Sequence, residues 1–192
     1  MSLILLEQIV SIIILVLMIA VIAFLFLMFL SGIISNIYGA PYVPISKKYV
    51  KDLLIFGGLK SNDIFYDLGS GDGRVLVAAA IDFGIKNAAG YEISFWPYWE
   101  SRFLLWQRGL SKMMKIHRLD FFRASFSDAT FVYMYLFPKL VDRLAQKISD
   151  ECKPGTKILC PSFPIDFNRH PEFKLLKSEK IGKIAAYLYE KI

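Results

Sequence analysis

The stretch that decides the fold is Asp67-Leu68-Gly69-Ser70-Gly71-Asp72-Gly73-Arg74. It follows the apolar run Ile64-Phe65-Tyr66, which predicts a buried strand, and it precedes a run rich in Val, Leu and Ala that predicts a helix. Glycine at alternate positions lets the backbone turn sharply and lets a ligand approach with no Cβ in the way. The block therefore predicts a strand, a tight glycine turn and a helix, with the acidic residue Asp67 at the end of the strand.

The chemistry of this turn points to a ligand with both a carboxylate and an ammonium group. The amides that open the following helix favour a negative group, and the carboxylate of Asp67 suits an ammonium. S-adenosylmethionine carries both groups together with an adenosine, so we expect it as the cofactor of a methyltransferase. A dinucleotide-binding turn usually reads G-x-G-x-x-G, and here the third glycine comes one residue early. Two other classes stay open: an NAD-type oxidoreductase and a non-catalytic scaffold that binds S-adenosylmethionine.

The segment Ile9–Leu30 is apolar throughout except for Ser11. A bilayer core of about 30 Å needs about 20 such residues in a helix. A secretory signal would carry basic residues before a shorter apolar core, whereas Glu7 precedes this one. We therefore expect residues 1–34 to form a retained transmembrane anchor; the alternative, a buried core helix, seldom stays apolar on every face for so long.

The charges that flank this segment predict its orientation. Lys47, Lys48 and Lys51 follow the apolar run, and nothing basic precedes it. The positive-inside rule then predicts a single-pass membrane protein whose C-terminal part is cytoplasmic. The formal net charge of +6 agrees with a body beside anionic headgroups. We expect no nucleic-acid partner, because the sequence has no basic helix, zinc finger or aromatic ribonucleoprotein motif.

The cysteines and histidines do not form a metal-binding pattern. Cys152 and Cys160 lack metal-ligand spacing, and His117 and His170 stand apart from other ligand types. We expect two free thiols in a reducing compartment and no metal site.

The rest of the chain divides into a linker and one domain. Residues 35–45 contain Pro41 and Pro44 and are expected to form an irregular linker. Residues 46–192 are enough for a single α/β domain, which begins with a helix capped by Ser46.

Within this domain, apolar patterning predicts alternating strands and helices. The expected strands are residues 63–67, 88–92, 115–119, 130–136 and 157–160, and the expected helices are residues 74–83, 95–107 and 139–149. Two further strand-like runs, Phe173–Ser178 and Ile184–Tyr189, predict a C-terminal antiparallel hairpin. The order predicts a mostly parallel, Rossmann-like sheet covered by helices, with ligands beyond the carboxyl ends of its strands.

Acidic residues follow three successive expected strands of this sheet. Besides Asp67, Glu92 ends the second strand, where a carboxylate can accept both ribose hydroxyls, and Asp120 follows the third, where it can accept the adenine amine. The alternative for each residue is a loop carboxylate that caps a helix. The expected cofactor-binding residues are Asp67, Gly69, Ser70, Gly71, Asp72, Gly73, Glu92, Asp120 and Phe121. Either Phe121 or its neighbour Phe122 would pack against the adenine ring.

Five segments together resemble one known family: Pro41-Tyr42-Val43-Pro44, Asp67–Arg74, Tyr91-Glu92-Ile93, Ser101-Arg102 and Tyr135-Leu136-Phe137-Pro138. The chain is similar to the small membrane-anchored class I methyltransferases, which include the eukaryotic lysine methyltransferases of the ATP synthase c subunit and of the adenine nucleotide translocase. The resemblance implies a seven-stranded fold, S-adenosylmethionine as donor and a protein lysine as acceptor. The chain departs from the family pattern in two places. The helix after Glu92 is unusually aromatic, and Pro161–His170 matches the family's late Phe-Pro element only loosely.

The segment after the fourth expected strand lies where the reactive methyl group would point. Tyr135 and Pro138 are therefore the candidate catalytic residues; the alternative for Tyr135 is a packed strand-end tyrosine. The sulfonium methyl is already activated, so the protein's task is to position a nucleophile and exclude water. Aromatic surroundings would lower the pKa of a lysine amine by desolvation. We expect the acceptor to be a lysine of a membrane protein, and we identify no general base.

Overall fold

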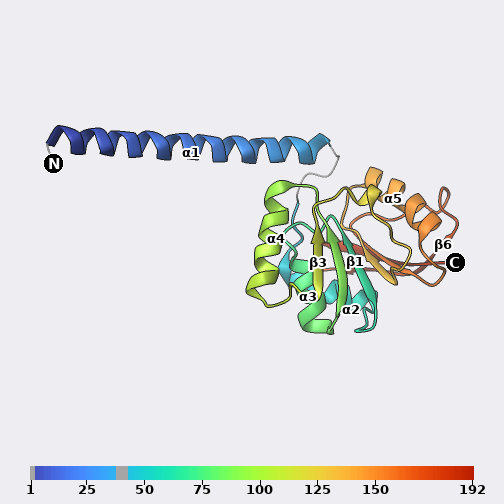
Figure 1. Cartoon of the computed structure of the whole chain (residues 1–192). Helices are drawn as coiled ribbons and strands as arrows, with labels where there is room; N and C mark the ends of the chain where they lie inside the picture. The colour runs from blue at the N-terminus through green and yellow to red at the C-terminus, as the bar shows by residue number, and fades with distance from the viewer. Residues whose placement is uncertain (1–2, 38–42) are drawn as a thin grey trace.

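The computed structural model describes residues 3–37 and 43–192. A long N-terminal helix, α1 (Leu3–Ile37), projects from an α/β domain whose seven-stranded sheet has the order β3-β2-β1-β4-β5-β7-β6 (Figure 1). The expected fold class, with a mostly parallel sheet and a C-terminal antiparallel hairpin, is confirmed.

The elements of the domain alternate along the chain as expected. Its strands are β1 (Ile64–Leu68), β2 (Asn87–Tyr91), β3 (Met114–His117), β4 (Phe131–Tyr133), β5 (Lys157–Pro161), β6 (Phe173–Ile181) and β7 (Ile184–Lys191). Its helices are α2 (Lys47–Gly57), α3 (Arg74–Phe83), α4 (Phe95–Gln107), the short 3-10 helix η1 (Phe121–Arg123) and α5 (Pro138–Glu151). Strands β1 to β5 pair in parallel, and β7 pairs antiparallel with both β5 and β6.

Several boundaries differ from those expected. Helix α1 continues to Ile37, three residues into the expected linker, because nothing before Ile37 breaks its helical pattern. Strand β4 ends at Tyr133 rather than at residue 136, because the chain leaves the sheet there to reach Pro138, the first residue of α5. Ser46 takes the expected N-cap position of α2, although its side chain makes no capping hydrogen bond.

The sheet has a hydrophobic core on each face. Successive residues of a strand point to opposite faces, so Phe65 packs with α2, α3 and α4 while Tyr66 packs with α5 and the hairpin. Both faces of the central strands are covered, which agrees with their nearly continuous apolar sequences.

Helix α1 stands outside this core. Over Ile4–Leu30 it is long and apolar enough to cross a membrane, judged by length and composition, and none of this segment is buried inside the protein. The alternative of a buried core helix is therefore wrong for the described part of α1. Its contact with the domain includes Phe24, whose ring meets that of Trp96 edge to face at 5.7 Å between centroids.

Both cysteines lie inside the domain as free thiols. Burial raises the pKa of Cys152 to about 11 and also raises the pKa of Cys160.

Candidate cofactor-binding and active site

A cavity of about 270 Å³ opens beyond the carboxyl ends of the central strands. Its walls are formed by the glycine loop after β1, the junction between β2 and α4, the segment after β4, Phe121, and two short stretches at residues 43–45 and 162–163. The cavity therefore lies at the edge of the sheet where the sequence predicts the cofactor.

The glycine loop is tied to strand β2. Gly69 and Gly71 both have positive φ angles, 81° and 53°, which glycine adopts without strain. The amides of Gly69 and Ser70 donate to the carbonyl of Tyr91 at 2.9 and 3.0 Å. Gly90 was not predicted as part of the site, but an added Cβ there would lie 2.6 Å from Leu76 Cδ1 and 2.8 Å from Ser70.

Asp67 is the most deeply buried acidic group of the cavity. Only 2% of the residue is exposed, and its Oδ2 has no hydrogen-bond partner among the described residues. Burial raises the pKa of Asp67 well above its ordinary value, and the neighbouring carboxylates Glu92 and Asp72 raise it further. An ammonium group placed beside Asp67 would lower this pKa again, because it favours the ionised carboxylate.

Two more cavity-lining residues carry buried polar atoms without a hydrogen-bond partner in the described part of the chain. These atoms are Ser70 Oγ and the hydroxyl of Tyr133. Tyr133 pairs in register with Asp67 across β4 and β1, so both side chains leave the sheet on the same face. Buried polar groups are normally hydrogen-bonded, and an amino-acid-like ligand would supply the partners, so the cavity fits S-adenosylmethionine.

Glu92 connects the glycine loop to the start of α4. Its Oε2 accepts a hydrogen bond from the amide of Gly71 at 3.0 Å, and its Oε1 accepts one from the amide of Ser94 at 2.7 Å. Each carboxylate oxygen keeps a further lone pair for a ligand hydroxyl. The expected ribose contact stays a prediction, while the observed bonds give Glu92 a role in shaping the loop.

An ion pair holds part of the expected linker against the cavity. Arg74 pairs with Asp72 at 2.6 Å, and its Nη1 donates to the carbonyl of Ile45 at 2.5 Å. Val43, Pro44 and Ile45 line the cavity as a result, and we call residues 43–45 the strap. Pro41 and Tyr42, which the sequence analysis also singled out, lie outside the described residues.

The expected site residues divide into two groups. Those that line the cavity are Asp67, Gly69, Ser70, Gly71, Asp72, Glu92, Phe121 and Tyr135. Gly73, Asp120 and Pro138 are not among the lining residues. An added Cβ at Gly73 would lie 3.0 Å from Ser101 Cβ, so this glycine allows α3 and α4 to approach closely. Asp120 Oδ1 accepts from the amide of Phe122 at 3.0 Å and caps η1, which is the alternative weighed for it, and Pro138 is exposed.

Aromatic side chains after β4 and β5 form another part of the cavity wall. Tyr135 and Phe137 follow β4, and the ring of Phe137 lies 6.3 Å from that of Phe163, which follows β5. Ser162, which directly precedes Phe163, has a φ of 74°, a strained conformation for a residue other than glycine. Nothing in the local sequence indicates this conformation, so the sequence analysis did not place Ser162 or Phe163 in the site.

Comparison with known proteins gives both a family and named relatives. Residues 67–171 match the family model of the ANTKMT methyltransferase domain. A protein-lysine N-methyltransferase from Saccharolobus islandicus (strain REY15A) is 36% identical over 132 residues, covering 69% of this chain and 82% of that protein. The lysine N-methyltransferase of the ATP synthase c subunit from Xenopus laevis is 34% identical over 125 residues, covering 65% of this chain and 54% of that protein. This chain thus matches about half the length of the frog relative.

Solved structures agree on the fold and on the class of ligand. An RNA methyltransferase from Salinibacter ruber, solved in complex with S-adenosyl-L-homocysteine, aligns with a TM-score of 0.70 and 27% identity. The alignment covers 78% of this chain and 94% of the other.

Proposed function

Because the chain belongs to the ANTKMT methyltransferase domain family and is an S-adenosylmethionine-dependent methyltransferase, we propose that its acceptor is a lysine side chain of a protein in or at the membrane that α1 spans. The observation that carries this proposal is one cavity lined both by buried polar atoms without a partner among the described residues and by aromatic side chains. The names of the relatives from Saccharolobus and Xenopus support lysine as the acceptor.

The polar side of the cavity would hold the cofactor. Asp67 would bind the ammonium group, since a cation relieves the cost of ionising a buried carboxylate. The loop around Gly71 would face the ligand carboxylate with its backbone, and Glu92 would accept from the ribose hydroxyls. When bound, S-adenosylmethionine supplies an activated methyl group on its sulfonium.

The aromatic side of the cavity prepares the acceptor. A lysine ammonium has a pKa near 10.4 in water and must lose a proton before its nitrogen can attack. The rings of Tyr135, Phe137 and Phe163 exclude water from the wall of the cavity, and desolvation lowers the pKa of an amine. These three residues would therefore position the acceptor and lower its pKa, so that the amine loses its proton to solvent without a dedicated base.

Helix α1 would hold this site at a membrane surface. The apolar segment of α1 matches a bilayer in length, and the strap that lines the cavity begins six residues after the end of α1. Such a tether raises the effective concentration of membrane-bound acceptors over soluble ones. The basic residues Lys47, Lys48 and Lys51 favour a cytoplasmic domain.

The test compares cells that make the native chain, cells without the gene and cells that make a Gly71→Val form. Val at Gly71, where φ is 53°, would strain the loop and fill space beside the ligand. Gly155→Val is the matched control, because Gly155 also has a positive φ, 87°, but precedes β5 at the opposite end of the strand from the cavity. Membrane proteins, soluble proteins, RNA and lipids from each strain are examined by mass spectrometry.

We expect a methyl-lysine on a membrane-fraction protein with the native chain and with Gly155→Val, and its loss in the other two strains. Loss of methyl groups only from soluble proteins, lipids or small molecules would show that the acceptor is misassigned. Loss only from RNA would do the same and would favour an activity like that of the Salinibacter relative.

A further inference from the structure

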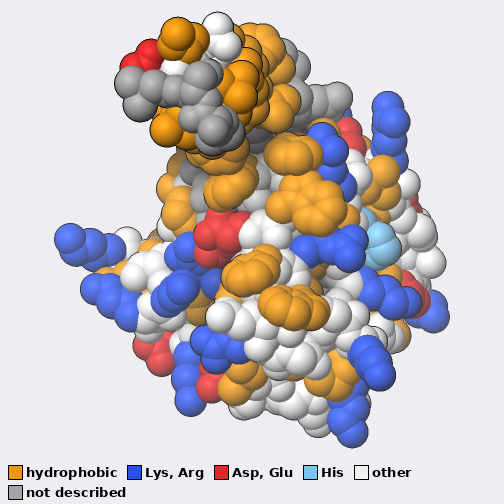
Figure 2. Space-filling model, turned by 60° about the vertical axis from the view of Figure 1, so that its left-hand side comes forward, with side chains coloured by type: hydrophobic (Ala, Val, Ile, Leu, Met, Phe, Trp, Pro, Cys, Tyr) orange, Lys and Arg blue, Asp and Glu red, His pale blue; other side chains and the backbone are white. Residues whose placement is uncertain are grey.

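Helix α4 presents an apolar face to solvent. Trp96, Trp99, Phe103 and Trp106 are 44%, 49%, 59% and 69% exposed. We call these four residues the aromatic stripe. Figure 2 shows this side of the domain, where orange side chains run down from α1 and blue side chains lie beside them.

The stripe is a second face of α4 and not an extension of its packed face. The residues of α4 that are buried against the sheet are Pro97, Ser101 and Leu105. At about 100° per residue, the centre of the stripe lies about 180° around the helix from the centre of this buried face. A helix on the surface of a globular domain ordinarily carries polar residues on the face turned away from the core. Packing in the core therefore does not explain the aromatic stripe.

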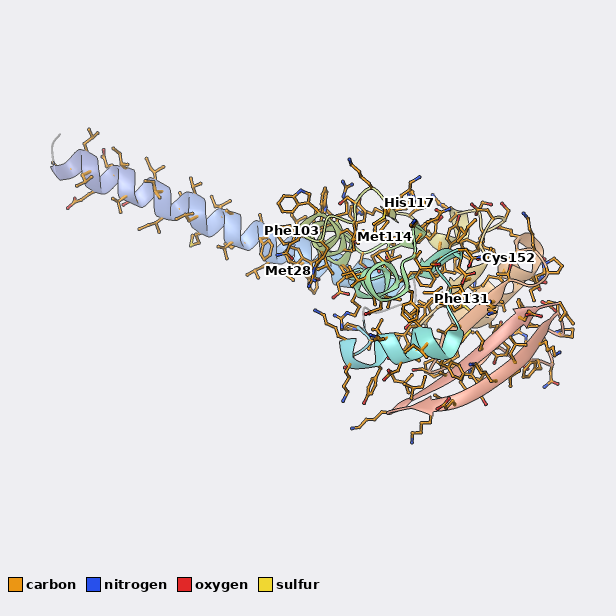
Figure 3. The ribbon with its side chains drawn as sticks, turned by 90° about the horizontal axis from the view of Figure 1, so that it is seen from below. Met28, Phe103, Met114, His117, Phe131 and Cys152 are labelled. Atoms are coloured by element: carbon orange, nitrogen blue, oxygen red, sulfur yellow. The ribbon has the colours of Figure 1, made fainter. Side chains whose placement is uncertain are left out.

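The position of α1 shows what the stripe faces. In Figure 1, α1 extends from the domain on the side that α4 occupies and runs across the N-terminal end of α4. Trp96 touches Phe24, which lies six residues, or about 9 Å of helix, before the end of the apolar span at Leu30. Helix α1 contacts α4, and Figure 3 shows both from below, with Met28 of α1 and Phe103 of α4 labelled. Interfacial helices bury their apolar faces about 5–10 Å into the boundary between headgroups and acyl chains. The contact between Trp96 and Phe24 places the stripe at this depth, if Leu30 marks the membrane surface.

The charges beside the stripe suit an anionic lipid surface. Arg102 lies over the ring of Trp99 at 5.6 Å, and Arg118 lies over the ring of Phe95 at 5.1 Å. Arg108 follows at the end of α4, and Glu100 is the only acidic residue of the helix. Tryptophan and arginine together are typical of the layer where acyl chains meet headgroups.

We propose that the aromatic stripe lies in the cytoplasmic interfacial layer of the bilayer that α1 spans, so that α4 docks the catalytic domain flat on the membrane. This inference rests on the proposed membrane anchoring. Ser94 and Ile93, at the start of α4, line the cavity, so docking α4 sets the mouth of the active site beside the lipid headgroups. The domain is thereby held by two contacts, a spanning helix and an interfacial helix.

The protein carries its own reporter for this arrangement. All three tryptophans of the chain belong to the stripe, so tryptophan fluorescence of the full-length protein reports on α4 alone. The protein is reconstituted in phosphatidylcholine–phosphatidylglycerol vesicles at low protein density, with the domain outward. Emission is then quenched either by phospholipids brominated in their acyl chains or by aqueous iodide.

Trp106 decides the test. Trp96 touches α1, so it would be close to lipid even if α4 met the membrane only with its end. Trp106 lies ten residues further along, about 15 Å away. In a Trp96→Phe/Trp99→Phe form that retains only Trp106, we expect brominated lipid to remove roughly half of the emission or more, and iodide to remove little. The matched control carries Leu176→Trp in a form whose own three tryptophans are Phe; Leu176 is 40% exposed on β6, on the opposite side of the domain, and should show the reverse pattern.

Two results would overturn the proposal. Trp106 open to iodide would mean that the stripe faces water. Trp106 shielded from iodide but unaffected by brominated lipid would mean that protein, such as a second copy of this chain, covers the stripe. A failure of the anchoring proposal is seen separately, because the protein would then not float with the vesicles at all, whereas a failure of docking alone leaves it floating with its tryptophans exposed.

Discussion

Asp67 sets the charge balance of the cavity at the scale of a single residue. Its carboxyl is almost wholly buried between two other acidic residues and has an oxygen without a partner among the described residues. A folded chain that raises the pKa of a carboxyl binds its proton more tightly than the unfolded chain does. Stability therefore falls as the pH rises from the ordinary value of an aspartate, about 3.9, through the raised value. The cofactor-free protein bears this cost at neutral pH.

Replacing Asp67 by Asn separates stability from binding. Because Asn resembles the protonated carboxyl, we expect the cofactor-free variant to unfold at a higher temperature than the native protein at neutral pH. The difference should shrink toward acid, below about pH 4, where the native carboxyl is protonated in both states. Thermal unfolding in detergent across this pH range checks the prediction.

The same variant should bind S-adenosylmethionine more weakly. A hydrogen bond to a charged group contributes about 1.5–3 kcal/mol, so we expect a roughly 10- to 100-fold rise in Kd, measured by calorimetry. Native affinity should also increase with pH, since the ligand selects the ionised carboxylate. An Asn variant that binds as tightly as the native protein would remove Asp67 from the ammonium site.

The sequence predicts the donor side of the site better than its walls. The glycine loop and Glu92 line the cavity as predicted. They could be predicted because a loop at the end of a strand is identified from local sequence alone. Tyr133 was not predicted because a tyrosine inside an apolar strand is typical of a core. Its pairing with Asp67 can be recognised only when the register of β1 and β4 is known. For Asp120 the sequence left two interpretations open, and the local one, a helix cap, is observed.

At the scale of elements, the strap joins the end of the expected linker to the catalytic loop. Residues 43–45 have no regular secondary structure, and their recorded tie to the loop is the bond from Arg74 to the carbonyl of Ile45. Arg74 is itself fixed by Asp72 of the glycine loop. Arg74 therefore links the glycine loop to the strap.

Removing that side chain should open the cavity. In Arg74→Ala, Asp72 stays buried without its ion-pair partner, and breaking a buried pair costs on the order of 3 kcal/mol. We expect lower thermal stability and weaker binding of S-adenosylhomocysteine. Lys51→Ala is the matched control, because it breaks an exposed pair with Asp82 on neighbouring helices and should change stability by less than about 1 kcal/mol. Equal effects of the two variants would contradict a special role for the strap.

Most elements follow from local patterning, and the exceptions have tertiary causes. Helices α3 and α4 begin and end at the residues expected from the sequence. Helix α4 carries apolar residues on two opposite faces, so its sequence alone does not show which face is packed against the sheet. Strand β4 is short because the chain leaves the sheet after Tyr133, although the neighbouring strands β1 and β5 continue past this point, and the apolar sequence of residues 130–136 does not show this.

At the scale of the whole molecule, the anchor and the domain meet in a defined way. Helix α1 projects from the domain, and its contact with α4 lies near the C-terminal end of its apolar span. If α1 crosses the bilayer, Lys47, Lys48 and Lys51 lie just beyond it on the side of the domain.

These lysines predict that the domain faces the cytoplasm. Protease added to sealed cells or right-side-out vesicles should leave the domain intact, whereas the same protease after detergent permeabilisation should digest it. A form with all three lysines replaced by Gln should lose part of this orientation bias. Digestion of the native domain in sealed vesicles would reverse the proposed topology.

The short connection between α1 and the strap has a consequence for which lysines are methylated. From Ile37 to Val43 the chain can span at most about 20 Å, however it is arranged. If α1 crosses the bilayer, this connection holds the cavity close to the headgroups. A lysine on a short loop beside the headgroups would then come within reach, while the same lysine on a tall domain of another membrane protein would lie too far from the bilayer.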